Sequence, residues 1–219
     1  MEKIKILSFR RHYLDSVLSM VIFKGRVLDI GGKKEKKRGN FRSPLDKVDS
    51  WEYLNVDKST NPDYCCSAEN IPIEENKFDM ALMAEVLEHL ENPSKVLQEA
   101  CRILKPTGKI IATMPFLYPI HADPYDYQRW TPERIKLEFE KAGFTIEKIT
   151  PMGSVFAVMY DLLYTSLGMA SKNRKALKNR IANRLLMPII ARVFLWFDGL
   201  YHYKSSSITT GYFICGIKK

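Results

Sequence analysis

Short apolar runs alternate with helical segments along much of this chain, and this alternation constrains its fold more than any other feature. Apolar runs of about four to eight residues bounded by turn residues are typical of buried strands, whereas apolar residues three and four apart are typical of helices. The pattern predicts an α/β protein with a mostly parallel sheet and helices on both faces. Strands are predicted at residues 26–30, 51–56, 64–66, 78–83, 109–113, 144–149 and 211–217, and helices at residues 10–23, 93–104 and 132–143.

Length and composition agree with one globular unit. The chain has 219 residues, of which 46% are apolar and 27% charged, and this excludes a disordered, collagen-like or coiled-coil protein. The four cysteines form no CxxC pair, so we expect reduced thiols and no metal site. The first 25 residues carry charges throughout, unlike a cleaved signal segment. We therefore expect a cytoplasmic protein.

Charge is distributed unevenly along the chain. Residues 1–149 hold 24 Lys and Arg against 23 Asp and Glu, whereas residues 150–219 hold ten against two. The segment 151–205 does not fit the alternation, because an apolar stretch whose one charge is Asp161 is followed by six basic residues within 171–184. We interpret this segment as an apolar and basic helical insertion before the last strand. Residues 1–150 and 206–219 would then form the core domain.

Small and polar residues follow four of the predicted strands. In open parallel sheets, ligands bind at the carboxyl ends of the strands, where glycines let the backbone approach a ligand and a carboxylate can accept hydrogen bonds from two ribose hydroxyls. Four such strand ends in register would line a nucleoside pocket. The residues concerned are Asp29, Gly31, Gly32, Asp57, Ser67, Ala68 and Glu85.

At these positions the sequence resembles the class I S-adenosylmethionine-dependent methyltransferases, and most of all the small-molecule branch with the ubiquinone and menaquinone methyltransferases. The likeness covers about residues 25–149 and the final strand. It implies a Rossmann-like sheet of seven strands whose last strand is antiparallel. The segments that carry it are 27–32 (VLDIGG), 53–57 (YLNVD), 67–72 (SAENIP), 78–79 (FD), 85–90 (EVLEHL) and 102–109 (RILKPTGK).

The resemblance implies S-adenosylmethionine as cofactor and a role for each strand end. Asp29, Gly31 and Gly32 would surround its methionine part, and Asp57 would bind the ribose hydroxyls. The adenine would contact Ser67 and Ala68, and the sulfonium would lie near Glu85. Two residues depart from the family pattern: Lys33 stands where a third glycine is usual, and Ser67 where an aspartate is often found. The missing third glycine also argues against a nicotinamide dinucleotide, whose fingerprint is GxGxxG.

The stretch 114–130, which follows the fifth strand, is the predicted acceptor site. It mixes five aromatic residues with His121, Asp123 and Asp126. Methyl transfer to oxygen needs a base for the hydroxyl proton, and His121 is the best candidate, with Asp123 or Asp126 to orient it; the alternative is that these residues only fix a polar loop. The stretch resembles methyltransferases encoded alongside surface-polysaccharide enzymes, which implies a small-molecule, saccharide or lipid-linked acceptor.

Several alternatives remain open for the insertion and for the whole protein. Asp161, Gly153 and Gly168 argue against a membrane-spanning segment. The insertion would instead be a lid or homodimer interface, or would lie on the inner face of a membrane. Its basic run could also bind RNA, although its aromatic residues lie among aliphatics rather than among charges, which disfavours nucleic acid. An inactive cofactor-binding scaffold is the alternative to an enzyme.

Overall fold

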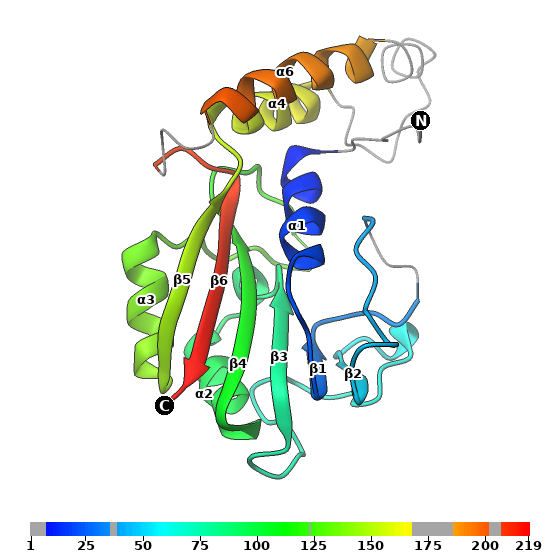
Figure 1. The fold of residues 1–219 in the computed structure, drawn as a ribbon, viewed down its shortest axis with the longest axis vertical. Coiled ribbons are helices and arrows are strands. Elements are labelled where there is room, and N and C mark those ends of the chain that lie inside the picture. Colours follow the sequence, from blue (N-terminus) through cyan, green and yellow to red (C-terminus); the bar gives the residue numbers. More distant parts are fainter. Residues whose placement is uncertain (1–7, 36–38, 123, 168–185, 202–206) are drawn as a thin grey trace.

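A sheet of six strands forms the centre of the computed structural model, which describes residues 8–35, 39–122, 124–167, 186–201 and 207–219. The strand order is β2-β1-β3-β4-β6-β5 (Figure 1), and β6 runs antiparallel to both neighbours while the other pairings are parallel. The α/β fold with a mostly parallel sheet and an antiparallel last strand is therefore confirmed. The strands are β1 (Arg26–Ile30), β2 (Ser50–Leu54), β3 (Phe78–Ala84), β4 (Leu104–Pro115), β5 (Phe144–Met152) and β6 (Gly211–Lys218).

The predicted strand at residues 64–66 is wrong, so the described sheet has six strands rather than seven. Tyr64 makes only an isolated parallel bridge with Leu54. The carbonyl of Tyr53 accepts hydrogen bonds from the amides of both Asp63 and Tyr64, at 2.9 and 3.0 Å, and the amide of Asn55 donates to the carbonyl of Tyr64 at 3.0 Å. The pairing extends no further than this one residue, because the chain turns again at Ser67.

Helices cover both faces of the sheet. Helix α1 (Phe9–Ser19) packs on one face, where Leu14 and Leu18 lie in a core cluster with side chains of β1, β2, β3 and β4. Helices α2 (Pro93–Ile103) and α3 (Pro132–Lys141) pack on the opposite face. Both begin with a proline in the first turn, a position where the absent amide proton costs nothing.

Two further helices lie between β5 and β6 in the chain and cross the upper end of the sheet, above α1 (Figure 1). They are α4 (Val155–Ser166) and α6 (Met187–Tyr201). Strand β5 extends to Met152, so the first two residues of the predicted insertion belong to the sheet. The six basic residues within 171–184 lie outside the described residues. Among the described helices, none is long and apolar enough to cross a membrane.

Two buried aspartates join α1, α4 and α6. Asp161 of α4 accepts hydrogen bonds from the amides of Phe9 and Arg10, at 2.7 and 2.8 Å, and so binds the start of α1. Asp198 of α6 accepts from the amides of Ser154 and Ala157, at 3.0 and 2.9 Å, at the start of α4. Asp198 also accepts from the hydroxyl of Tyr13 on α1. These bonds fix α1, which carries part of the candidate site.

Candidate cofactor and acceptor site

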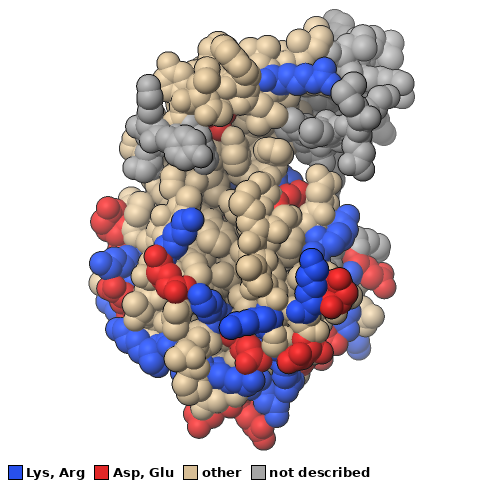
Figure 2. Space-filling view, in the orientation of Figure 1, with Lys and Arg blue, Asp and Glu red and all other residues tan. Residues whose placement is uncertain are grey.

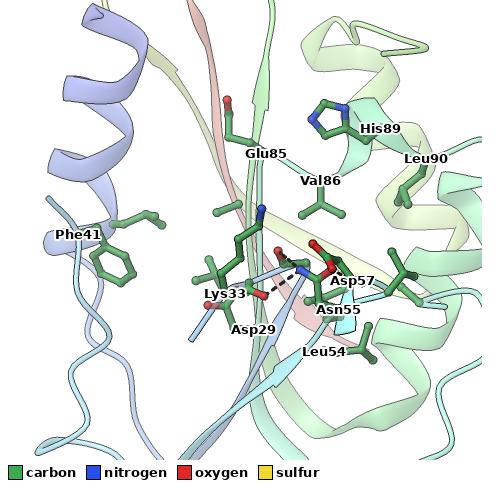
Figure 3. A pocket seen from close by; sticks show the side chains of 18 of the residues that line it. Asp29, Lys33, Phe41, Leu54, Asn55, Asp57, Glu85, Val86, His89 and Leu90 are labelled. Carbon is green, nitrogen blue, oxygen red and sulfur yellow. Dashed lines mark hydrogen bonds between the residues drawn. The ribbon is translucent and has the colours of Figure 1, made fainter. Parts of the chain in front are cut away.

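A cavity of about 530 Å³ opens at the carboxyl ends of β1, β2 and β3. Figure 3 shows Asp29, Lys33, Asn55 and Asp57 grouped at the ends of β1 and β2, with Glu85 and His89 on the other side of the space. Helix α1 closes one wall through Arg10, Arg11, Asp15 and Leu18. All seven residues predicted for the cofactor line this one cavity: Asp29, Gly31, Gly32, Asp57, Ser67, Ala68 and Glu85.

The loop after β1 requires its two glycines. Gly31 has a φ of +81°, and a Cβ there would lie 2.6 Å from Cγ2 of Val86. At Gly32 a Cβ would lie 2.3 Å from the carboxyl carbon of Asp29. A side chain at either position would therefore displace Val86 or the carboxylate of Asp29, both of which line the cavity. These contacts explain why two glycines stand here although the third is absent.

Asn55, which sequence reasoning did not single out, connects the two loops that form the floor of the cavity. Its side-chain amide donates to the carbonyl oxygens of Gly31 and Gly32, both at 3.0 Å. Its side-chain oxygen accepts from the amide of Asp57 at 2.9 Å. The side chain is 8% exposed. Asn55 therefore sets the distance between the glycine loop and Asp57.

Asp57 lies at the mouth of the cavity and begins the short helix η1 (Lys58–Thr60). Its carboxylate accepts from the amide of Ser59 at 2.9 Å. Hydrogen bonding from Ser59, with a smaller contribution from the charge of Lys33, holds the pKa of Asp57 below its usual value. The residue is therefore a carboxylate at neutral pH, as hydrogen bonding to ribose hydroxyls requires. The hydroxyl of Ser67 accepts from the amide of Glu69 at 3.2 Å, which shapes the adjoining turn.

Glu85 follows β3 in a left-handed conformation, with a φ of +58°. Its amide donates to the hydroxyl and carbonyl oxygens of Thr113, at 3.1 and 3.2 Å. Its carboxylate forms an ion pair with Arg10 of α1, and the two side chains are 7% and 9% exposed. The guanidinium of Arg10 also lies over the ring of Tyr118, 4.1 Å from its centroid. Arg10, another residue that the sequence pattern did not indicate, thus joins α1 to the end of β3.

The predicted acceptor residues occupy the loop after β4, with different outcomes. His121 lines the cavity, and its Nδ1 lies 3.4 Å from a carboxylate oxygen of Asp126. Burial above all, and the nearby Arg10, lower the pKa of His121 to about 4, so the ring is neutral at pH 7. Asp126 does not line the cavity; its paired hydrogen bonds with Arg129 are the main cause of a pKa of about 2. Asp123 lies outside the described residues.

Residues 44–112 match the family described as a methyltransferase domain. The match spans 69 of the 219 residues, and it supports S-adenosylmethionine as the cofactor. The cavity fits that cofactor, because its polar groups and glycines lie at the ends of three parallel strands. The Rossmann-like methyltransferase fold follows from the same evidence. The small-molecule branch within the class remains a prediction.

Curated relatives match this chain over part of their length. An uncharacterized protein of Methanocaldococcus jannaschii is 35% identical over 89 residues, which is 40% of this chain and 43% of that protein. The mitochondrial 2-methoxy-6-polyprenyl-1,4-benzoquinol methylase of Caenorhabditis elegans is 26% identical over 106 residues, 48% of this chain and 32% of that enzyme. The chain thus matches less than half the length of these relatives.

Solved structures extend the likeness to nearly the whole chain. The [4+2]-cyclase SpnF has a TM-score of 0.63 at 18% identity, over 99% of this chain and 84% of SpnF. Phosphoethanolamine N-methyltransferase 2 of Haemonchus contortus, in complex with S-adenosylmethionine, has a TM-score of 0.55 at 19% identity, over 95% of this chain and 52% of that enzyme. At these identities the likeness shows the fold, which hosts more than one reaction.

Proposed function

We propose that this protein transfers the methyl group of S-adenosylmethionine to a hydroxyl oxygen of a small-molecule, saccharide or lipid-linked acceptor. The observation that carries the proposal is the single cavity that joins all seven predicted cofactor residues to His121. Methyl transfer is an in-line displacement that requires the attacking atom to be held about 3–3.5 Å from the methyl carbon. A cofactor bound at the strand ends would direct its sulfonium toward Glu85, on the side where His89 and His121 line the cavity.

Oxygen is the proposed target because of the groups at that end of the cavity. His121 is neutral at pH 7, and its Nδ1 faces Asp126, so its Nε2 is the nitrogen left to accept a hydroxyl proton. The methylase of Caenorhabditis elegans, whose name describes a polyprenyl benzoquinol, supports a lipid-linked acceptor by likeness. The acceptor loop also carries exposed aromatic side chains, Tyr125 and Tyr127, against which a sugar or quinol ring could pack.

Calorimetric titration with S-adenosylhomocysteine tests the cofactor half of the proposal. We expect micromolar binding that weakens at least tenfold in Asp57→Ala, because the carboxylate at the cavity mouth is lost. Asp46→Ala removes an exposed aspartate outside the cavity and is the matched control. Absence of binding at millimolar ligand would contradict the proposal and favour the inactive scaffold. With binding established, transfer of labelled methyl groups to polar and lipid extracts would identify the acceptor class.

We also propose that the outer face of α4 and α6 rests on a membrane surface. This face exposes large apolar side chains, among them Leu162 (47%), Ile189 (60%) and Trp196 (63%). In the view of Figure 2, the described surface over these helices carries few charges, unlike the mixed surface below it. Six basic residues within 171–184, next to α4 and α6 in the chain, would add attraction to anionic lipid.

Co-sedimentation with vesicles of anionic and neutral lipid tests this contact. We expect binding to anionic vesicles to fall several-fold in the double variant Leu162→Ser, Trp196→Ser, and to remain in Leu45→Ser, which removes a more exposed leucine elsewhere. Unchanged vesicle binding in the double variant would refute membrane contact through this face. A change from dimer to monomer in sedimentation equilibrium, without vesicle binding, would instead assign the face to a homodimer.

A further inference from the structure

Three side chains that could bind a metal ion converge beside the cavity. Glu88 and His89 come from the short helix η2 (Leu87–His89) after β3, and His121 comes from the loop after β4. One carboxylate oxygen of Glu88 lies 3.6 Å from Nε2 of His89 and 3.7 Å from Nε2 of His121. The three ligand atoms all lie within 4.8 Å of one another. Two imidazoles and a carboxylate are a donor set typical of divalent transition metals.

The carboxylate of Glu88 lacks the partners that a buried charge requires. Its side chain is 0% exposed, and beyond its own backbone amide neither carboxylate oxygen has a hydrogen-bond partner among the described residues. A buried carboxylate without partners is costly, and proteins normally pair it or bind a metal with it. A cation beside this carboxylate would supply the missing partner.

Both histidines direct Nε2 toward Glu88. Nδ1 of His89 hydrogen-bonds the carbonyl oxygen of Tyr125 at 2.5 Å. Nδ1 of His121 lies 3.4 Å from a carboxylate oxygen of Asp126, without a hydrogen bond among the described residues. A metal-binding histidine usually donates its second N–H to a carbonyl or carboxylate, as His89 can, because that fixes the tautomer and leaves Nε2 for the metal.

The charges around the cluster leave room for a cation. Arg10 is paired with Glu85, and Arg129 with Asp126, so both nearby guanidinium groups already have carboxylate partners. Glu88 is then the buried carboxyl group of this cluster that has no guanidinium partner among the described residues.

We propose that Glu88, His89 and His121 bind a divalent transition metal of the Zn²⁺ type. This inference departs from the sequence-based expectation of no metal site. Tetrahedral Zn²⁺ binds nitrogen and oxygen at about 2.0–2.2 Å, which places ligand atoms about 3.3–3.6 Å apart. The two distances from Glu88, 3.6 and 3.7 Å, are already close to this, and all three ligand atoms lie within 4.8 Å of one another. His89 and His121 both line the cavity, which leaves a fourth coordination position open toward it.

The use of that open position rests on the proposed function. The metal would hold the hydroxyl oxygen of the acceptor and lower its pKa, so that the hydroxyl proton passes to solvent before or during attack. The oxygen then forms a bond to the methyl carbon while the carbon–sulfur bond breaks and its electron pair returns to sulfur. His121 would serve as a metal ligand in this scheme rather than as the base.

Metal binding to the full chain tests the site without any assay of methyl transfer. The protein is stripped with a chelator, and Zn²⁺ is titrated in competition with a chromophoric chelator, while Co²⁺ gives an absorption spectrum that reports its ligands. We expect one tight site per chain, weakened by about 100-fold or more in Glu88→Gln and in His121→Asn. His12→Asn, which changes a half-buried histidine of α1, is the matched control and should bind as the unaltered protein does. Cys65→Ser combined with Cys66→Ser removes the adjacent thiols as an alternative site.

Each outcome decides the proposal. No stoichiometric Zn²⁺ in the unaltered protein overturns it, as does equal affinity in Glu88→Gln and His121→Asn, or loss only in the cysteine variant. Circular dichroism establishes whether each variant is folded, and two substitutions on different segments guard against failure of one. S-adenosylhomocysteine titration is run in parallel. Zn²⁺ binding without S-adenosylhomocysteine binding would retain the metal site and reject the proposed function, and the reverse result would do the opposite.

Discussion

Replacement of Asn55 by alanine is the sharpest test of how the cavity floor is built. The substitution removes three hydrogen bonds of 3.0, 3.0 and 2.9 Å from a side chain that is 8% exposed. A buried hydrogen bond contributes about 1 kcal/mol net, so the free energy of unfolding should fall by about 3 kcal/mol. For a chain of this length that is a fall in Tm of about 6–12 °C.

Cofactor affinity should fall as well, because ligand binding would have to reorder the loops that Asn55 holds together. If about half of the lost energy appears in this way, the Kd for S-adenosylhomocysteine rises about tenfold. Urea unfolding measures the first effect and calorimetry the second. Asn92→Ala, which removes one exposed hydrogen bond of 3.3 Å to Glu69, is the control and should change neither. A change below about 0.5 kcal/mol in unfolding, with affinity unaltered, would refute the reasoning.

Two glycines and one buried aspartate give further predictions. Gly31→Ala should lower the free energy of unfolding by about 2 kcal/mol, because of its φ of +81° and the contact with Val86. Gly199→Ala, within α6, should raise it by about 0.5–1 kcal/mol, because its Cβ meets nothing within 4 Å. Urea titrations check both, and a rise for Gly31→Ala or a fall for Gly199→Ala would contradict the respective prediction. Burial raises the pKa of Asp161 from 3.8 to about 6, so the folded state holds this proton more tightly than the unfolded state. Its contribution to stability is full below about pH 4 and is lost as the pH rises to about 6, by about 3 kcal/mol in all. Asp161→Asn cannot titrate, so the stability difference between the two proteins should change by that amount over this range, and a constant difference in urea titrations at several pH values would exclude this origin.

Local sequence features predicted most of the fold. Strand and helix positions follow from runs and spacings that act over a few residues. Six of the seven predicted strands exist, β1 with the predicted bounds and five with altered ends. The seventh failed because pairing at Tyr64 depends on where the chain turns on both sides of it, which no local pattern reports. The likeness to methyltransferases predicted the strand ends that line the cavity; their roles toward the cofactor remain predictions.

The tertiary structure alone reveals the residues that connect these strand ends. Arg10 lies 75 positions before its ion-pair partner Glu85. Asp161, which accepts a hydrogen bond from the amide of Arg10, lies 151 positions after it. Asn55 lies within the segment 53–57 that carries the likeness to methyltransferases. Nothing in that segment indicates that its side-chain amide donates to two carbonyl groups of another loop. Pairings at such separations depend on how the elements pack.

By itself, the sequence determined the alternating α/β architecture, the glycines after β1 and the carboxylates at the strand ends, because each of these is dictated by local backbone chemistry and hydrophobic pattern. Only the tertiary structure decided that α1 forms a wall of the cavity, held by the buried Asp161 and Asp198 of α4 and α6. It also brought Glu88 and His89 beside His121, over thirty residues away in the chain. The physical reason is that burial and charge pairing are properties of packed elements, and a chain acquires them only once it is folded.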